Sequence, residues 1–141
     1  MKKLRFASFG NVLIIVLSFL LILNGCGVQK LSEDFDEEQV RKSAENVIDI
    51  INRQDTEALR ELCTVQMREA LTDDVLKKVY EAIGEGGAYE KIEDMSVAGM
   101  TNKQSEEEFA VVVAKAKYEI KKFTFTITFT KQMKLAGLYY R

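Results

Sequence analysis

The sequence has 141 residues and carries 20 basic and 22 acidic side chains, a formal net charge of −2. It contains no His, Trp or Pro and only two Cys, which excludes Ser-His-Asp and Cys-His catalysis, His-ligated zinc or haem, and a disulfide framework. This charge balance also argues against a nucleic-acid partner. We therefore expect one domain, with no cofactor and no metal site.

The first 25 residues predict a secretory signal. Lys2, Lys3 and Arg5 form a basic start, and a twelve-residue apolar run follows from Val12 to Leu23. As a helix this run would span about 18 Å, short of the ~30 Å hydrocarbon core of a bilayer. An uncleaved membrane anchor stays open as an alternative, because the residues around the run are also uncharged.

The apolar run ends in Leu23-Asn24-Gly25-Cys26, which resembles the lipobox of bacterial lipoproteins. The resemblance implies cleavage between Gly25 and Cys26, thioether diacylation of Cys26, and a location on the extracytoplasmic face of the cell membrane. Two buried acyl chains are enough for stable anchoring. The mature chain would then have 116 residues, with 17 basic and 22 acidic side chains and a net charge of −5. Residues 26–34 are mostly polar and predict a lipidated Cys followed by a short tether.

The first half of the folded part has helical periodicity. We expect helices at 36–54, 55–63 and 72–83, with a looser turn between the second and the third. Their N-terminal caps are predicted at Asp36, Asp55 and Thr72. Glycines at 84, 86 and 87 end the third helix, because glycine readily adopts the left-handed conformation that follows helices.

After Gly87 the periodicity changes to the alternation of β-strands. We expect strands at 89–97, 109–117, 123–130 and 133–140, with a polar turn at 99–105. The clearest is 123–130, where Phe and Ile alternate with Thr, so its apolar face must be buried. The strand at 109–117 is apolar on both faces and is predicted to be covered on both sides. Gly137 predicts a bulge or close contact in the last strand.

Helices followed by strands predict an α+β domain over residues 35–141, with three N-terminal helices on one face of a curved antiparallel sheet of about four strands. Three segments resemble the domain of unknown function 3887: Val47-Ile-Asp-Ile-Ile-Asn-Arg-Gln-Asp55, Gly87-Ala-Tyr-Glu-Lys-Ile92 and Lys134-Leu-Ala-Gly-Leu-Tyr139. That family belongs to the nuclear transport factor 2-like, cystatin-like superfamily of α+β cones. The resemblance implies a pocket between the first helices and the sheet, and it implies no activity.

Enzymes of that superfamily, such as ketosteroid isomerase and scytalone dehydratase, place acids, Tyr or His inside the cone. The candidates here are Asp49 on the first helix and Tyr89, Glu93 and Asp94 near the first strand. General acid-base catalysis by a carboxylate needs a raised pKa in an apolar wall. The position of Asp49 favours the solvent edge of its helix, so we assign no catalytic residue. Cys63 is expected to be a small buried residue, and the alternative of a reactive thiol lacks a His partner.

Charge is distributed unevenly along the chain. Residues 30–94 hold 9 basic and 18 acidic side chains, whereas residues 95–141 hold 8 and 4. The basic excess lies on the predicted sheet, at Lys115, Lys117, Lys121, Lys122, Lys131 and Lys134. One interpretation is a basic surface that contacts anionic lipid or an envelope polymer, and the other is that lysines protect strand edges. The acidic clusters at 34–38 and 106–108 lack calcium-loop spacing and suit helix capping and solubility.

A stripe of threonines on the clearest strand permits two interpretations. Thr is an ordinary exposed-strand residue, but the regular spacing of Thr124, Thr126, Thr128 and Thr130 also suits a flat binding face. The second interpretation includes a homodimer formed through the sheet, with Ala110, Val112 and Ala114 as its apolar patch.

From the sequence we expect a membrane-anchored extracytoplasmic lipoprotein that acts as a binding or interaction module for a small ligand, a peptide or an envelope polymer. Two alternatives remain open. One is a small carboxylate- or Tyr-dependent enzyme that resembles an isomerase or a dehydratase. The other is a structural subunit that assembles through its sheet.

Overall fold

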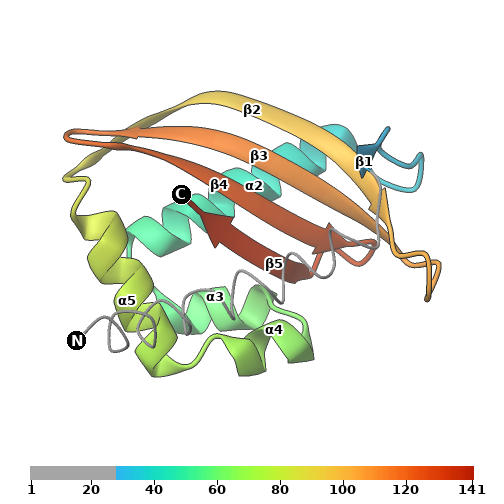
Figure 1. Ribbon diagram of the computed structural model, residues 1–141, viewed down its shortest axis with the longest axis horizontal. Coiled ribbons are helices and arrows are strands. Elements are labelled where there is room, and N and C mark those ends of the chain that lie inside the picture. The colour runs from blue at the N-terminus through green and yellow to red at the C-terminus, as the bar shows by residue number, and fades with distance from the viewer. Residues whose placement is uncertain (1–27) are drawn as a thin grey trace, which may run out of the picture.

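The computed structural model describes residues 28–141 and has helices on one side of a single sheet (Figure 1). Its elements in chain order are β1 (Val28–Gln29), α2 (Glu37–Asn52), α3 (Thr56–Leu62), α4 (Val65–Ala70), α5 (Asp73–Gly84), β2 (Tyr89–Thr101), β3 (Glu108–Tyr118), β4 (Lys122–Thr130) and β5 (Leu135–Tyr140). The strands pair antiparallel in the order β1-β2-β3-β4-β5. The α+β architecture predicted from the sequence is therefore confirmed.

Each helix begins where a side chain accepts a hydrogen bond from a free backbone N–H group. The predicted caps Asp36, Asp55 and Thr72 all do so. The segment expected to be a looser turn instead forms α4, a fourth helix. Its cap is Thr64, whose hydroxyl accepts from the N–H of Met67 at 3.1 Å.

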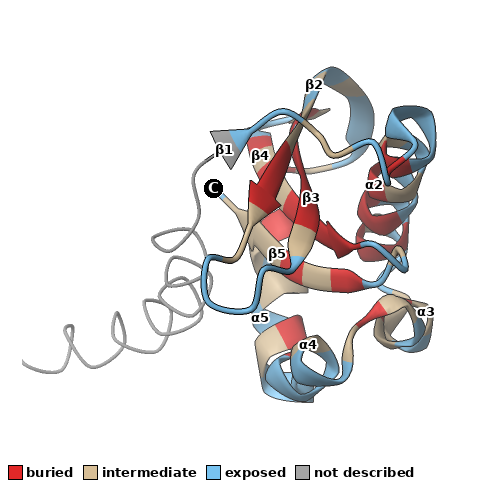
Figure 2. Ribbon diagram, turned by 90° about the vertical axis from the view of Figure 1, so that its right-hand side faces the viewer, coloured by how far each residue is buried: buried red, intermediate tan, exposed pale blue. Residues whose placement is uncertain are grey.

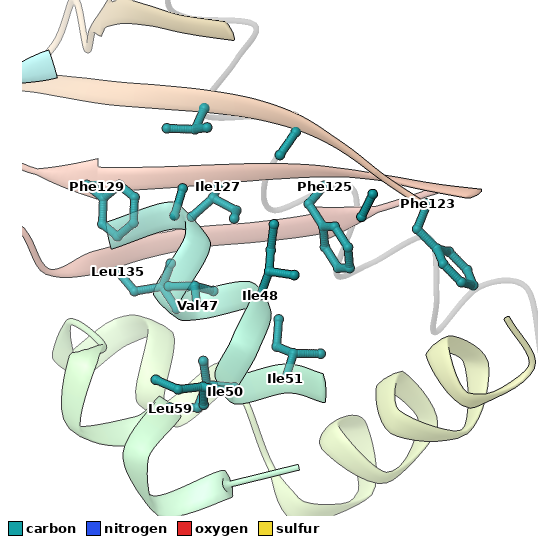
Figure 3. Close-up of a cluster of buried hydrophobic side chains, with 14 of the residues drawn as sticks. Val47, Ile48, Ile50, Ile51, Leu59, Phe123, Phe125, Ile127, Phe129 and Leu135 are labelled. Atoms are coloured by element: carbon teal, nitrogen blue, oxygen red, sulfur yellow. The ribbon is translucent and has the colours of Figure 1, made fainter. Parts of the chain in front are cut away.

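The core lies between α2 and the concave face of the sheet. Figure 3 shows Val47, Ile48 and Ile51 of α2 directed toward the β4 side chains. On that strand, Phe125 and Ile127 are both 0% exposed. The predicted burial of the Phe and Ile face of β4 is confirmed, and burial of this apolar area is the main term that stabilises the domain.

Some strands are longer or shorter than the sequence predicts, because long-range pairing determines where they begin and end. β2 continues through Gly99 and Met100, which pair with both β3 and β1. The polar turn therefore starts later than predicted, at Asn102. In β5 the register shifts so that Ala136 is the extra residue, which places the bulge next to Gly137.

The segment before α2 folds against the sheet. Val28 pairs with Met100 and Gln29 with Gly99. Leu31 packs against the core, so the described part of the expected tether, residues 28–34, lies on the domain. The predicted signal and Cys26 lie outside the described residues. No helix among residues 28–141 is long and apolar enough to cross a bilayer.

Candidate functional site

The side of the sheet that faces away from the helices carries a second apolar cluster. We call this side the outer face and its cluster, Met100, Phe109 and Val111 with Ala136 packed against it, the outer cluster. The described helices all lie on the opposite face (Figure 2). Because side chains alternate along strands, Val113 continues the same row on β3.

Threonines of β4 complete the outer face. Phe109 lies opposite Thr130, Val111 opposite Thr128, and Val113 opposite Thr126. The outer face is therefore a mixed surface of apolar and hydroxyl side chains that crosses β2, β3, β4 and β5.

Thr128 is the most unusual side chain of this surface. It is 2% exposed, and its hydroxyl has no hydrogen-bond partner among the described residues. By contrast, the hydroxyl of Thr130 accepts from the N–H of Lys134 at 3.1 Å. An unpaired buried hydroxyl is costly, so Thr128 lowers the stability of this part of the sheet.

The residues predicted to form the apolar patch of a homodimer point the other way. Ala110, Val112 and Ala114 are each 0% exposed and belong to the core beneath the helices. That expectation is wrong because β3 is apolar on both faces, and alternation alone does not say which face meets the helices. Phe109 and Val111 are on the outer face instead, and at 8% and 9% exposed they offer little apolar surface.

Most of the sheet lysines are paired, which reduces the basic character expected of this half. Lys117 lies 3.2 Å from Glu90, Lys121 3.1 Å from Glu85, and Lys122 3.1 Å from Glu93. Lys131 bridges Asp34 at 2.8 Å and Glu108 at 3.0 Å, and these carboxylates raise the pKa of its ammonium group. Lys134 donates to the carbonyl of Glu61 at 3.4 Å. Lys115 lies opposite Asp94 in the register.

The carboxylates considered for catalysis are on the surface. Asp49 is exposed and lies 2.9 Å from Arg53. The hydrogen bond from Lys122 lowers the pKa of Glu93, the opposite of what a general acid needs. Asp94 is also exposed. Tyr89 is 41% exposed, and its pKa is raised first by partial burial and then by nearby Glu45 and Asp49.

A partly buried polar pair that the sequence did not reveal connects α2 to β3. The hydroxyl of Tyr118 donates to Oδ1 of Asn52 at 2.5 Å. Tyr118 is 3% exposed, and burial raises its pKa to about 12. Its ring also makes edge-to-face contacts with Tyr89 and Phe123, with centroids 5.4 and 5.2 Å apart. The contact is non-local, so no spacing in the sequence could have indicated it.

Cys63 lies at the end of α3, and its side chain is part of the hydrophobic core. It is 2% exposed, and its thiol donates to the carbonyl of Leu59 at 3.2 Å. Burial raises its pKa to about 11, although Arg68 and Arg60 act against this shift. A thiol in this state is a weak nucleophile, which agrees with the expectation of a small buried residue.

The acidic side chains at the start of α2 all have partners within the domain. Glu37 pairs with Arg41 and Glu38 with Lys42, at 2.8 and 3.0 Å. Asp36 is occupied as the helix cap. Among residues 28–141, no group of three His, Cys, Asp or Glu side chains is arranged to hold a metal ion.

Two open hollows lie on the helical side, and neither lies between α2 and the sheet. One, of about 440 Å³, is lined by Gln54, Lys77 and Glu81 around a hydrogen bond of 2.9 Å between the hydroxyls of Thr56 and Tyr80. The other lies along the N-terminal half of α2. Core side chains fill the space where the family resemblance implies a pocket. The outer face is thus the better candidate for an interaction site.

Comparison with known proteins places the fold in a family. The model of the family described as "Protein of unknown function (DUF3887)" matches residues 44–138, which is two thirds of the chain. The chain belongs to the DUF3887 family. The matched region of this DUF3887 protein runs from α2 into β5, so it includes the core and the outer face.

A solved structure shares the fold of this DUF3887 protein. It is the NMR structure of a protein from Ruminococcus gnavus ATCC 29149, with a TM-score of 0.71 and 21% sequence identity. The similarity covers 79% of this chain and 96% of the other. At this identity the similarity shows the fold alone. No curated protein matches the chain.

Proposed function

We propose that this DUF3887 protein is a bacterial lipoprotein, held by acyl chains on Cys26 at the extracytoplasmic face of the cell membrane. Its domain is a nuclear transport factor 2-like cone that acts as an interaction module at the envelope. The lipobox-like sequence that ends at Cys26 supports the anchor. A curved sheet with helices on one face supports the cone.

The observation that carries this proposal is the position of β1. The strand begins at Val28 and is paired with β2, so Gly27 alone separates the folded domain from Cys26. A protein that displayed a ligand site far from the membrane would need a longer linker. The short connection supports a module whose contacts lie at the membrane surface.

The alternatives are supported less well. An isomerase- or dehydratase-like activity needs a carboxylate with a raised pKa in an apolar wall, whereas Asp49, Glu93 and Asp94 are exposed. A structural role through the sheet has one observation in its favour, the outer cluster beside the unpaired hydroxyl of Thr128.

Substitution of each cysteine in turn tests the anchor. In Cys26→Ala, incorporation of labelled palmitate and association with the membrane fraction should both be lost, because the acyl chains supply the stable binding. Cys63→Ala is the matched control and should retain both, since Cys63 is buried in the domain. Persistent labelling of Cys26→Ala would refute the proposal, as would a mature N-terminus other than Cys26 by mass spectrometry.

A further inference from the structure

The acyl anchor would hold one defined end of the domain. From Cys26 to Val28 the chain spans at most about 7 Å. Val28 pairs with Met100, a member of the outer cluster. The anchor point is therefore close to the apolar part of the outer face. On the basis of the proposed acylation of Cys26, we propose that the outer face of the sheet lies on the bilayer surface.

Charge does not oppose contact between the outer face and lipid. The acidic side chains Asp34, Glu37 and Glu38 before and at the start of α2 are paired with Lys131, Arg41 and Lys42, so they do not decide the orientation of the domain. Two neighbouring rows of the outer face contain no charged side chain. They are Phe109, Val111 and Val113 on β3 and Thr126, Thr128 and Thr130 on β4. The central rows of the outer face therefore meet little electrostatic resistance at an anionic leaflet.

The size and chemistry of the outer face suit a flat contact. Phe109 and Val113 are four residues apart on β3, or about 13 Å. The contact region thus lies within about 20 Å of the anchor point. Val113 is 40% exposed although it is apolar. Met100, Phe109 and Val111 are 1%, 8% and 9% exposed, so Val113 is the residue of these rows that offers apolar surface to the lipid. An exposed apolar side chain gains free energy at the boundary between headgroups and acyl chains, and the anchor keeps it there without a further binding partner.

Quenching by brominated lipid tests this contact in the full-length acylated protein. We would label the introduced thiol of Val113→Cys with bimane and reconstitute the protein into phosphatidylcholine and phosphatidylglycerol vesicles that contain lipids brominated in the acyl chains. Val65→Cys is the matched control, because Val65 is an exposed valine on α4, in the helical layer. Cys63 stays unlabelled because it is buried. We expect about threefold stronger quenching at position 113 than at position 65.

The outcomes separate this proposal from the anchor on which it depends. Mass spectrometry of the same sample reports whether Cys26 is acylated, and a protein without acyl chains would refute the anchor itself. Equal quenching at the two positions in an acylated protein would overturn the bilayer contact alone. Disulfide crosslinking between two copies of Val113→Cys would also overturn it, because the outer face would then belong to a homodimer. Matching urea midpoints for both variants and the parent protein would establish that each is folded.

Discussion

Tyr118 connects α2 to the sheet through one partly buried hydrogen bond. Its hydroxyl donates to Asn52 at the end of α2, whereas its ring packs in a row with Tyr89 and Phe123. The other amide atom of this pair, Nδ2 of Asn52, is buried with no partner among the described residues. The hydrogen bond holds the end of the helix against β3, and the unpaired Nδ2 removes part of the stability that a fully satisfied pair would have.

Asn52→Ala should destabilise the domain by about 1 to 3 kcal/mol, because it leaves the Tyr118 hydroxyl buried without an acceptor. Urea unfolding followed by circular dichroism would measure the loss. Tyr118→Phe in the Asn52→Ala background should cost less than Tyr118→Phe alone, since no hydroxyl is then left unpaired. Strict additivity of the two substitutions would show that the hydrogen bond contributes nothing.

Two buried groups make the domain sensitive to alkaline pH. The folded pKa of Cys63 is about 11 against an ordinary 9.0, and that of Tyr118 is about 12 against 10.0. The unfolded chain therefore loses these protons first, so the stability is fully present below pH 9 and is lost as the pH rises from 9 to 12. Each group can contribute up to roughly 2 to 3 kcal/mol.

Urea unfolding midpoints at pH 8, 10 and 11 measure the slope of stability against pH. Cys63→Ala should flatten it between pH 9 and 11, and Tyr118→Phe should flatten it above pH 10, because each substitution removes one titrating group. A pH dependence that is unchanged in both variants would show that other groups, such as the surface lysines, cause the alkaline loss.

β1 is a two-residue strand that depends on a close approach of two backbones. A Cβ atom on Gly99 would lie 2.4 Å from the carbonyl oxygen of Lys30 and 3.1 Å from Cα of Leu31. Only glycine lets the segment after β1 cross β2 at this distance and continue into the core. The close crossing explains why residues 28–34 lie on the domain.

Gly99→Ala should separate β1 from β2 and cost about 1 to 3 kcal/mol, because backbone atoms rather than a flexible side chain must move. Gly84→Ala is the control, since nothing lies within 4 Å of its added Cβ at the end of α5. It should be neutral or stabilising by up to about 1 kcal/mol. Hydrogen exchange at Gln29 and urea unfolding would measure both effects, and equal stabilities would argue against the crossing as a constraint.

Local patterns in the sequence predict most elements, and the errors in the sheet arise where pairing is non-local. The error in the helical half is local, because α4 forms where a looser turn was expected. The alternation at 123–130 predicts both β4 and its buried face, because Phe and Thr differ sharply in hydrophobicity. On β3 both faces are apolar, so Val112 and Val111 are indistinguishable from sequence. β1 is too short to have a period, and its existence depends on Met100, about seventy residues away. The outer cluster could not be predicted for the same reasons.

The domain as a whole has two unlike sides. Helices cover one face of the sheet, and their surface is rich in paired charges. The other face is uncharged across its central rows and begins beside the anchor point. Under the proposed anchoring, the helical side faces the envelope, and the two hollows around Tyr80 and along α2 are accessible from there.

The short connection to Cys26 should itself determine how the outer face contacts lipid. Insertion of twelve Gly and Ser residues between Gly27 and Val28 would let the domain move about 20 Å from its anchor, since flexible chains extend by about 5 to 6 Å times the square root of their length. Palmitate labelling should persist, but lipid quenching of a bimane at Val113→Cys should fall severalfold, because the effective concentration of the face at the bilayer drops roughly tenfold. The same insertion after Gln104, in the turn between β2 and β3, leaves the connection unchanged and should leave the quenching unchanged. If the two insertions gave equal quenching, contact with the bilayer would not depend on the short connection, and the outer face would have to hold the membrane by its own affinity.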